Sequence, residues 1–212
     1  MSNFGGRLTS TGDYEPELTR AIEATLQPGQ TFVDIGANEG WYTAIGCRAV
    51  GPDGLVIAVE PQERCWSAVH QNLMLNNLFN YRLIPYAVGA STGDVDIFLY
   101  PSLNNEASTL VANRRMRHFQ RQKTKMLSLE ELTSVLKIRQ IDLIKIDCEG
   151  YELKVLQGAE RLMRSGLIKR VILELHPKQL VELGAKPSDV TDLLGAFGYR
   201  QSSLGPVTVW EK

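Results

Sequence analysis

"TFVDIGANEGWYTA", residues 31–44, passes from an apolar stretch through a glycine-containing turn into a helical pattern. Asp34, Gly36, Asn38 and Gly40 stand at alternate positions on this junction. Glycine permits positive φ and close approach of a ligand to the backbone, and the start of a helix offers unpaired N–H groups. The stretch therefore predicts a strand–turn–helix unit whose turn either only closes the unit or holds a ligand.

Strand and helix patterns alternate along the rest of the chain, which is typical of a mainly parallel sheet with helices on both faces. The runs "TFVDI", "LVIAV" and "IDLIKI" are continuously apolar, as expected of strands buried on both faces. "GDVDIFLY" at 93–100 alternates and predicts an extra edge strand, while "YRQSSLGPVTVWEK" predicts a closing antiparallel hairpin. We expect an α/β fold with one doubly wound sheet.

Composition indicates one globular domain over residues 1–212, since 43% of the residues are hydrophobic and 22% are charged. Residues 1–13 are expected to be flexible, and residues 101–125 are expected to form an insertion on the substrate side. A net charge of −1 predicts no nucleic-acid partner. Three cysteines without zinc spacing, the absence of a signal-peptide pattern, and the absence of an apolar run of about 20 residues predict a cytoplasmic protein that is not inserted in a membrane.

Two carboxylates indicate what the turn would bind. The dinucleotide fingerprint G-x-G-x-x-G is not met, and Asp34 at the strand end would repel a pyrophosphate but suits an ammonium group. Glu60 ends the next strand, in "AVEP", where an acid accepts hydrogen bonds from ribose hydroxyls. An ammonium partner and a ribose partner in one crevice together indicate S-adenosylmethionine.

Four motifs, "FVDIGANEGWYT", "VEP", "IDLIKIDCEGYELKVLQGA" and "LELH", resemble those of FkbM-type S-adenosylmethionine-dependent methyltransferases. The resemblance extends over nearly the whole chain. It implies a class I methyltransferase (Rossmann-like) fold with seven strands in the order 3-2-1-4-5-7-6, the last strand antiparallel, and methyl transfer to oxygen. The residues predicted to contact the cofactor are Asp34, Gly36, Ala37, Asn38, Gly40, Tyr42, Glu60, Pro61, Ala87, Val88, Asp147 and Tyr14.

A group of acids and one imidazole is expected at the ends of two neighbouring strands. "KIDCEG" carries Asp147 and Glu149, and "LELH" carries Glu174 and His176. We predict that these four residues are catalytic: His176 is the base that accepts the proton of a hydroxyl, and Asp147 and Glu149 orient the acceptor or the methyl donor. A cluster that only orders the strand ends, with Lys145 as partner, is the structural alternative. No metal is predicted, although magnesium or manganese would suit these ligands.

The acceptor side of the site is predicted from polar and basic residues between 104 and 125. "NNEASTL" at 104–110 offers amides and hydroxyls, and residues 114–125 carry six lysines and arginines without an acid. The basic run is either a solvated face or a lid that meets an anionic or carrier-bound acceptor. The predicted substrate contacts are Asn104, Ser108, Arg114 and Arg115.

These observations predict an S-adenosylmethionine-dependent O-methyltransferase acting on a sugar, a glycan or a polyketide-like small molecule. A nicotinamide-dependent oxidoreductase would share the fold and Glu60 but lacks its glycine fingerprint. A non-catalytic cofactor-binding protein, docking a partner through residues 114–125, would have no need of the acid and imidazole cluster. An enzyme is therefore the favoured interpretation.

Overall fold

The computed structural model describes residues 14–99, 119–205 and 207–212. The expectations for residues 1–13, and the substrate contacts predicted at Asn104, Ser108, Arg114 and Arg115, lie outside these ranges.

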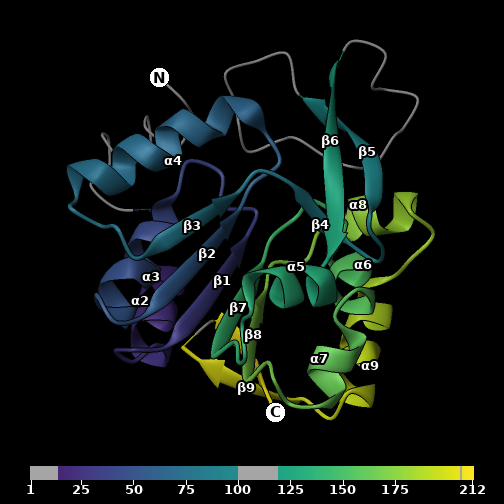
Figure 1. Cartoon of the computed structure of the whole chain (residues 1–212). Coiled ribbons are helices and arrows are strands. Elements are labelled where there is room, and N and C mark those ends of the chain that lie inside the picture. Colours follow the sequence, from purple (N-terminus) through teal and green to yellow (C-terminus); the bar gives the residue numbers. More distant parts are fainter. Residues whose placement is uncertain (1–13, 100–118, 206) are drawn as a thin grey trace.

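The main sheet has seven strands in the order β3-β2-β1-β7-β8-β10-β9. The first five are parallel, and β10 runs antiparallel to both β8 and β9. This arrangement confirms the class I methyltransferase order (Figure 1). The strands are β1 (Thr31–Ile35), β2 (Leu55–Val59), β3 (Tyr81–Ile84), β7 (Leu143–Ile146), β8 (Arg170–Leu173), β9 (Arg200–Leu204) and β10 (Val207–Glu211).

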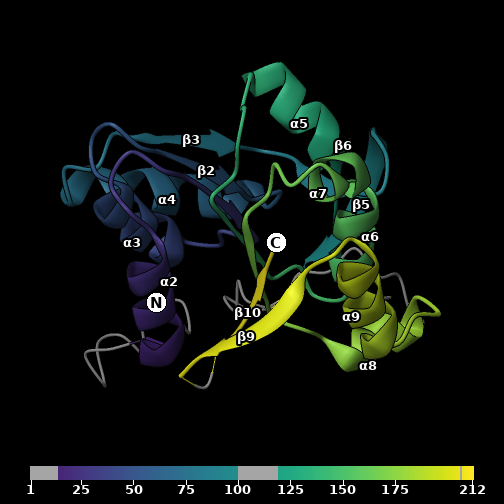
Figure 2. The same cartoon turned by 90° about the horizontal axis from the view of Figure 1, so that it is seen from below.

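Helices cover both faces of this sheet, as Figures 1 and 2 show from two directions. Successive residues of β1 point to opposite faces, so that Phe32 belongs to one core cluster and Val33 and Ile35 to the other. The Phe32 cluster includes residues of α2 (Pro16–Thr25), α3 (Trp41–Val50) and α4 (Glu63–Leu75). The Val33 cluster includes residues of α5 (Leu129–Leu136), α6 (Glu152–Gln157), α7 (Glu160–Arg164), α8 (Pro177–Glu182) and α9 (Pro187–Ala196).

A second sheet lies beside the main one, with three strands in the order β4-β6-β5. They are β4 (Ala87–Gly89), β5 (Gly93–Leu99) and β6 (Gln120–Ser128). The extra strand predicted at 93–100 is present as β5, but it pairs with β6 and not with an edge of the main sheet. Its partner comes from the segment 101–125, which lacks a clear strand pattern, so the sequence did not predict this pairing.

Local packing divides the helical segment 152–164 into two helices. The described structure has α6 and α7 there, separated at Gly158 and Ala159. A Cβ atom on Gly158 would lie 2.0 Å from the carbonyl oxygen of Gly89. The close approach of this turn to β4 therefore requires glycine.

No helix in the described ranges has the length and the apolar character that crossing a membrane requires.

Candidate active site

The turn after β1 is shaped by residues with positive φ. Gly36, Asn38 and Gly40 have φ values of 80°, 49° and 89°. A Cβ atom on Gly36 would lie 1.8 Å from the carbonyl oxygen of Asp147, so the ends of β1 and β7 are in direct backbone contact. Gly36 was predicted to let a ligand approach the backbone closely. In the structure, the group that requires glycine at this position is the Asp147 carbonyl.

Glu60 follows β2 and is bound to the same turn. Its side chain is buried, its Oε2 accepts a hydrogen bond from the Asn38 N–H at 2.8 Å, and its Oε1 accepts one from the Gln62 N–H at 2.8 Å. Burial raises the pKa of Glu60 to about 7, although both N–H groups favour the ionised form. The carboxylate is therefore oriented before any ligand binds.

A buried cation joins β1 to β7. Lys145 is 1% exposed, and its Nζ lies 3.0 Å from Asp147 Oδ2 and 3.7 Å from Asp34 Oδ1. Burial alone would lower the pKa of Lys145, but the carboxylates of Asp147 and Asp34 raise it. Asp34 is fully buried, accepts a hydrogen bond from Thr43 Oγ1 at 2.7 Å, and has its pKa raised by burial. Asp147 keeps 27% of its side chain exposed, so it is the member of this group that a ligand can reach.

A cavity of about 30 Å³ lies in front of the turn. This volume holds about two water molecules. Tyr14 covers it, with its ring 6.2 Å from that of Trp41 and 6.4 Å from that of Tyr42, and the Tyr42 hydroxyl donates a hydrogen bond to Glu15. The lining residues are Tyr14, Gly36, Ala37, Asn38, Glu39, Trp41, Tyr42, Lys145 and Asp147.

Half of the predicted cofactor residues line this cavity, namely Tyr14, Gly36, Ala37, Asn38, Tyr42 and Asp147. The other half, Asp34, Gly40, Glu60, Pro61, Ala87 and Val88, are not part of its lining. Of these, Ala87 and Val88 are buried in β4, in the second sheet. Lys145 lines the cavity but was expected only as a partner for the acids. A larger hollow of about 720 Å³ lies elsewhere, between residues of α5, α6 and α7, and contains none of the predicted site residues.

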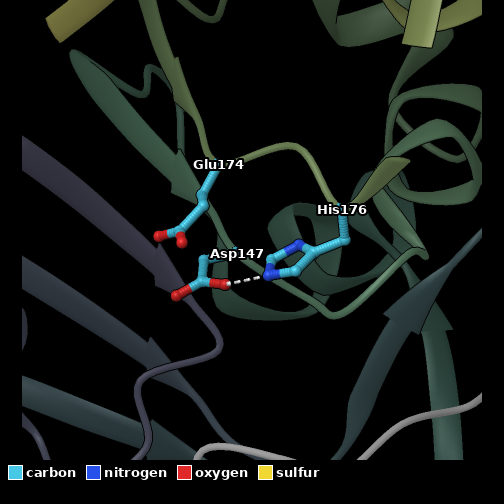
Figure 3. Close-up of side chains that lie close together, drawn as sticks. All are labelled: Asp147, Glu174 and His176. Carbon is cyan, nitrogen blue, oxygen red and sulfur yellow. Dashed lines mark ion pairs between the residues drawn. The ribbon is translucent and has the colours of Figure 1, made fainter. Parts of the chain in front are cut away.

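The structure brings together the acids and the imidazole at the ends of β7 and β8 (Figure 3). His176 Nε2 lies 3.7 Å from Asp147 Oδ1 and 3.8 Å from Glu149 Oε2. Asp147, Glu174 and His176 each offer an atom within 4.8 Å of the others, so these three could hold a divalent cation. The Lys145 ammonium already compensates part of the charge of Asp147.

Glu152, at the start of α6, was not among the predicted site residues. Its side chain is fully buried, and its Oε1 lies 2.8 Å from His176 Nδ1 and accepts a hydrogen bond from the Gly150 N–H at 2.9 Å. An acid in the first turn of a helix is common because its negative charge interacts favourably with the positive end of the helix dipole. The motif "IDLIKIDCEGYELKVLQGA", which carries the family resemblance, contains this glutamate, but no role was predicted for it.

For His176, burial and the neighbouring carboxylates shift the pKa in opposite directions. Burial would lower the pKa of His176, but the neighbouring carboxylates, first Glu152 and then Glu149 and Asp147, raise it to about 9. Burial raises the pKa of Glu149 to about 7, and burial together with Asp147 raises that of Glu174. In the absence of ligand the imidazole is therefore cationic at neutral pH, and it must lose its proton before it can act as a base.

The basic run is partly neutralised by β5. Arg121 forms an ion pair with Asp96, and Lys123 and Lys125 stand opposite Asp96 and Asp94 in the antiparallel register. The sequence showed no acid within residues 114–125, but these acids come from a strand more than twenty residues earlier. The strand half of the run is therefore a paired surface, which favours the solvated-face interpretation over the basic lid.

A sequence model of the family described as "Methyltransferase FkbM domain" matches residues 34–201. Among curated proteins, the chain is 26% identical to "Methyltransferase sdnD" of Sordaria araneosa, covering 71% of this chain and 68% of the relative. It is also 26% identical to "Hexuronic acid methyltransferase AglP" of Haloferax volcanii, covering 85% of this chain and 67% of the relative.

Solved structures share the fold. A methyltransferase FkbM from Methylobacillus flagellatus KT superposes with a TM-score of 0.56 at 14% identity, covering 92% of this chain and 50% of that one. A SAM-dependent methyltransferase from Aquifex aeolicus superposes with a TM-score of 0.52 at 16% identity, covering 97% and 90%. This chain therefore spans half the length of the Methylobacillus protein and nearly all of the Aquifex protein.

Proposed function

The chain belongs to the FkbM methyltransferase family, and we propose that it transfers a methyl group from S-adenosylmethionine to a hydroxyl oxygen of a sugar, a glycan or a polyketide-like small molecule. The family and its fold support methyl transfer with this cofactor; the oxygen acceptor is the part that we infer from the site.

One observation carries the choice of oxygen: the His176 imidazole stands among carboxylates, with Nε2 near Glu149 and near Asp147, which lines the cavity. An alcohol is a poor nucleophile, and its proton must leave as the new bond to carbon forms. A positioned imidazole can accept that proton. The two carboxylates can accept hydrogen bonds from further hydroxyls of the acceptor and so orient it.

The residues around the turn fit the cofactor in chemistry. Glu60 presents a buried carboxylate at the end of β2, where ribose hydroxyls would donate to it, and Asp147 is a partly exposed carboxylate suited to an ammonium group. Lys145 and Thr43 both contact the Asp34 carboxylate in the structure. Asp34 therefore acts on the cofactor site through these two residues. When bound, S-adenosylmethionine supplies a methyl group made electrophilic by its sulfonium sulfur.

The chain's own residues would then contribute in three ways. Tyr14 and Trp41 line the cavity and would exclude water from it. Asp147 and Glu149 orient the acceptor, and His176 Nε2 takes the hydroxyl proton. A positive charge bound nearby lowers the pKa of an imidazole, so a cationic cofactor would favour the neutral form that can act as a base.

Among acceptors, a hexuronic acid is the first to test, because the curated relative AglP is named for that substrate class. Because a hexuronic acid is anionic at neutral pH, and the lysines and the arginine of β6 face Asp94 and Asp96, the acceptor panel pairs it with neutral sugars. Residues 114–118 lie outside the described ranges.

The first experiment compares thermal unfolding with S-adenosylhomocysteine and with NAD. We expect stabilisation by S-adenosylhomocysteine alone, since a ligand that binds only the folded state raises its stability. Stabilisation by NAD alone would overturn the proposal in favour of the oxidoreductase.

The second experiment incubates the protein with methyl-labelled S-adenosylmethionine and a panel of hydroxylated acceptors that includes hexuronic acids. Label found on nitrogen or carbon, and not on oxygen, would contradict the proposed acceptor atom.

A further inference from the structure

Glu152 makes the shortest contact of the acid and imidazole cluster. It approaches His176 at Nδ1, with 2.8 Å between Oε1 and Nδ1, whereas Asp147 and Glu149 lie 3.7 and 3.8 Å from the other ring nitrogen, Nε2. The Glu152 side chain has no exposed surface, and the His176 side chain keeps 16% of its own. The imidazole is thus held between a buried acid and two partly exposed ones.

The chemistry of this contact determines which nitrogen carries hydrogen in the neutral ring. An ionised carboxylate can only accept hydrogen bonds, so Nδ1 must be the donor to Glu152. In a neutral imidazole the other nitrogen then has a lone pair. That nitrogen, Nε2, is the one directed toward Asp147 and Glu149, where the acceptor hydroxyl of the proposed reaction would lie.

The turn between β7 and α6 is built to hold the glutamate in this place. Glu149 and Gly150 have positive φ values of 51° and 98°, and the Gly150 N–H donates to Glu152 Oε1. On α8, Gln179 Nε2 donates to Glu149 Oε2 at 3.0 Å, and a Cβ atom on Gly150 would lie 2.3 Å from Gln179 Cβ. The turn is therefore packed against the helix that follows His176.

Burial of this carboxylate is costly unless it is compensated. Within the described part of the chain, Glu152 Oε2 has no hydrogen-bond partner, so the compensation falls on Oε1 and its contacts with His176 and Gly150. A role confined to the start of α6 would need only the Gly150 contact. Such a role does not explain why Glu152 also contacts the His176 imidazole.

We propose that Glu152 is a positioning residue that holds the hydrogen of His176 on Nδ1 and keeps the Nε2 lone pair directed into the active site. Glu152 does not touch the reacting atoms; it acts through His176. The inference rests on the proposed function only where it treats His176 as the base. The position of the hydrogen is a property of the free protein.

The charged groups around the imidazole are known from every element that meets it. Glu152 faces Nδ1 from α6, Asp147 and Glu149 face Nε2 from the turn after β7, and Glu174 follows β8 on the same strand end as His176. Lys145 forms an ion pair with Asp147. Each of these acids favours the imidazolium, but among the described residues Glu152 is the one acid in contact with Nδ1, and this difference separates its role from theirs.

The test is a pH titration of the ¹⁵N-labelled protein by nuclear magnetic resonance, in which the three histidines are distinguished by a His176→Asn variant. We expect the neutral form of His176 to carry hydrogen on Nδ1. Glu152→Gln should lower the pKa of His176 toward its ordinary value of 6.5 and weaken the preference for Nδ1. The matched control, Glu149→Gln, removes a carboxylate near Nε2 and should lower the pKa while leaving hydrogen on Nδ1.

Two results would overturn the proposal: hydrogen on Nε2 in the neutral wild-type ring, or an unchanged pKa and nitrogen preference in a folded Glu152→Gln protein. Should Glu152→Gln fail to fold, the wild-type measurement still decides, and Glu152→Asp, which keeps the charge, should keep hydrogen on Nδ1. The spectra require no turnover. Failure to bind S-adenosylhomocysteine would therefore count against the proposed function, whereas the wrong nitrogen would count against Glu152.

Discussion

The two sides of the active-site crevice are built by different physical means. The turn wall, residues 36–40 with Glu60, is shaped by positive φ values and by backbone N–H groups that orient one carboxylate. The acid wall, residues 145–152 with Glu174 and His176, is shaped by charges that compensate one another. The walls meet where Gly36 touches the Asp147 carbonyl. We propose from this difference that the turn wall mainly binds the cofactor and the acid wall mainly transfers the proton, and five experiments test this division.

The largest expected effect is on the rate of methyl transfer in His176→Ala. Loss of a positioned base typically slows a reaction by about 10² to 10⁴-fold. Because His176 belongs to the acid wall, the affinity for S-adenosylhomocysteine should change by less than about threefold, or under 1 kcal/mol. Transfer of labelled methyl and calorimetric titration measure the two quantities. A variant that no longer binds the cofactor product would contradict the division between the walls.

Stability should respond most to Lys145→Met, which removes the cation between Asp34 and Asp147. Breaking a buried ion pair by removing one partner typically costs about 3–5 kcal/mol, because a charge is left without compensation. Urea unfolding measures this loss. Lys178→Met, at an exposed lysine of α8, is the matched control and should change the free energy of unfolding by less than about 0.5 kcal/mol. Equal stability of the two variants would show that the acid wall does not depend on this cation.

The contact between the walls is tested by comparing Gly36→Ala with Gly29→Ala. Both glycines have positive φ, 80° and 84°, but an added Cβ meets the Asp147 carbonyl at Gly36 and nothing within 4 Å at Gly29. We expect Gly29→Ala to cost about 1–2 kcal/mol from backbone strain alone. Gly36→Ala should cost about 1–3 kcal/mol more, as overpacking does. Similar unfolding free energies for the two would mean that the walls are not in tight contact.

Removal of the turn-wall carboxylate should weaken binding but leave the acid wall intact. Glu60→Ala should lower the affinity for S-adenosylhomocysteine by about 30-fold, which corresponds to about 2 kcal/mol for hydrogen bonds to a charged group. Calorimetric titration measures the change. Glu63→Ala, three residues later and exposed, is the control and should bind as the wild type does. An unaltered affinity in Glu60→Ala would remove Glu60 from the cofactor site.

The smallest expected effect is a pH dependence of binding that comes from the same carboxylate. Because burial raises the pKa of Glu60 to about 7, the group is mostly protonated below that pH and mostly ionised above it. The ionised form accepts more hydrogen bonds, so affinity for S-adenosylhomocysteine should rise by up to about tenfold from about pH 6 to about pH 8. Glu60→Gln should lose this part of the dependence. A wild-type affinity that falls over this range would contradict the role of the ionised form.

Much of this arrangement was predicted from the sequence because the signals are local. Continuous apolar runs indicated the parallel strands, and the acids of "KIDCEG" and the acid of "LELH" were correctly placed at neighbouring strand ends. Gly36 was expected to permit close approach, and it does, although the approaching group is the Asp147 carbonyl. The assignment of individual residues to cofactor and acceptor remains a prediction.

Other features had no local signal. The partner of β5 is β6, from a segment that the sequence left without a strand, and their pairing places Asp94 and Asp96 beside the basic run. Asp34 was expected to meet the cofactor's ammonium directly, but the structure surrounds it with Thr43 and Lys145, and the more accessible acid is Asp147. Glu152 belongs to a motif that carries the family resemblance, but its contact with His176 was not predicted.

The sequence by itself determined the order and type of the main elements, the glycines of the turn wall, and the residue types of the acid wall. Only the tertiary structure decided which charges compensate one another: Lys145 with Asp34 across two strands, and Glu152 with His176 across 24 positions of the chain. The reason is physical. Periodicity and turn chemistry act over a few neighbouring residues, whereas a buried charge is stabilised by whichever group the folded chain brings within a few ångströms.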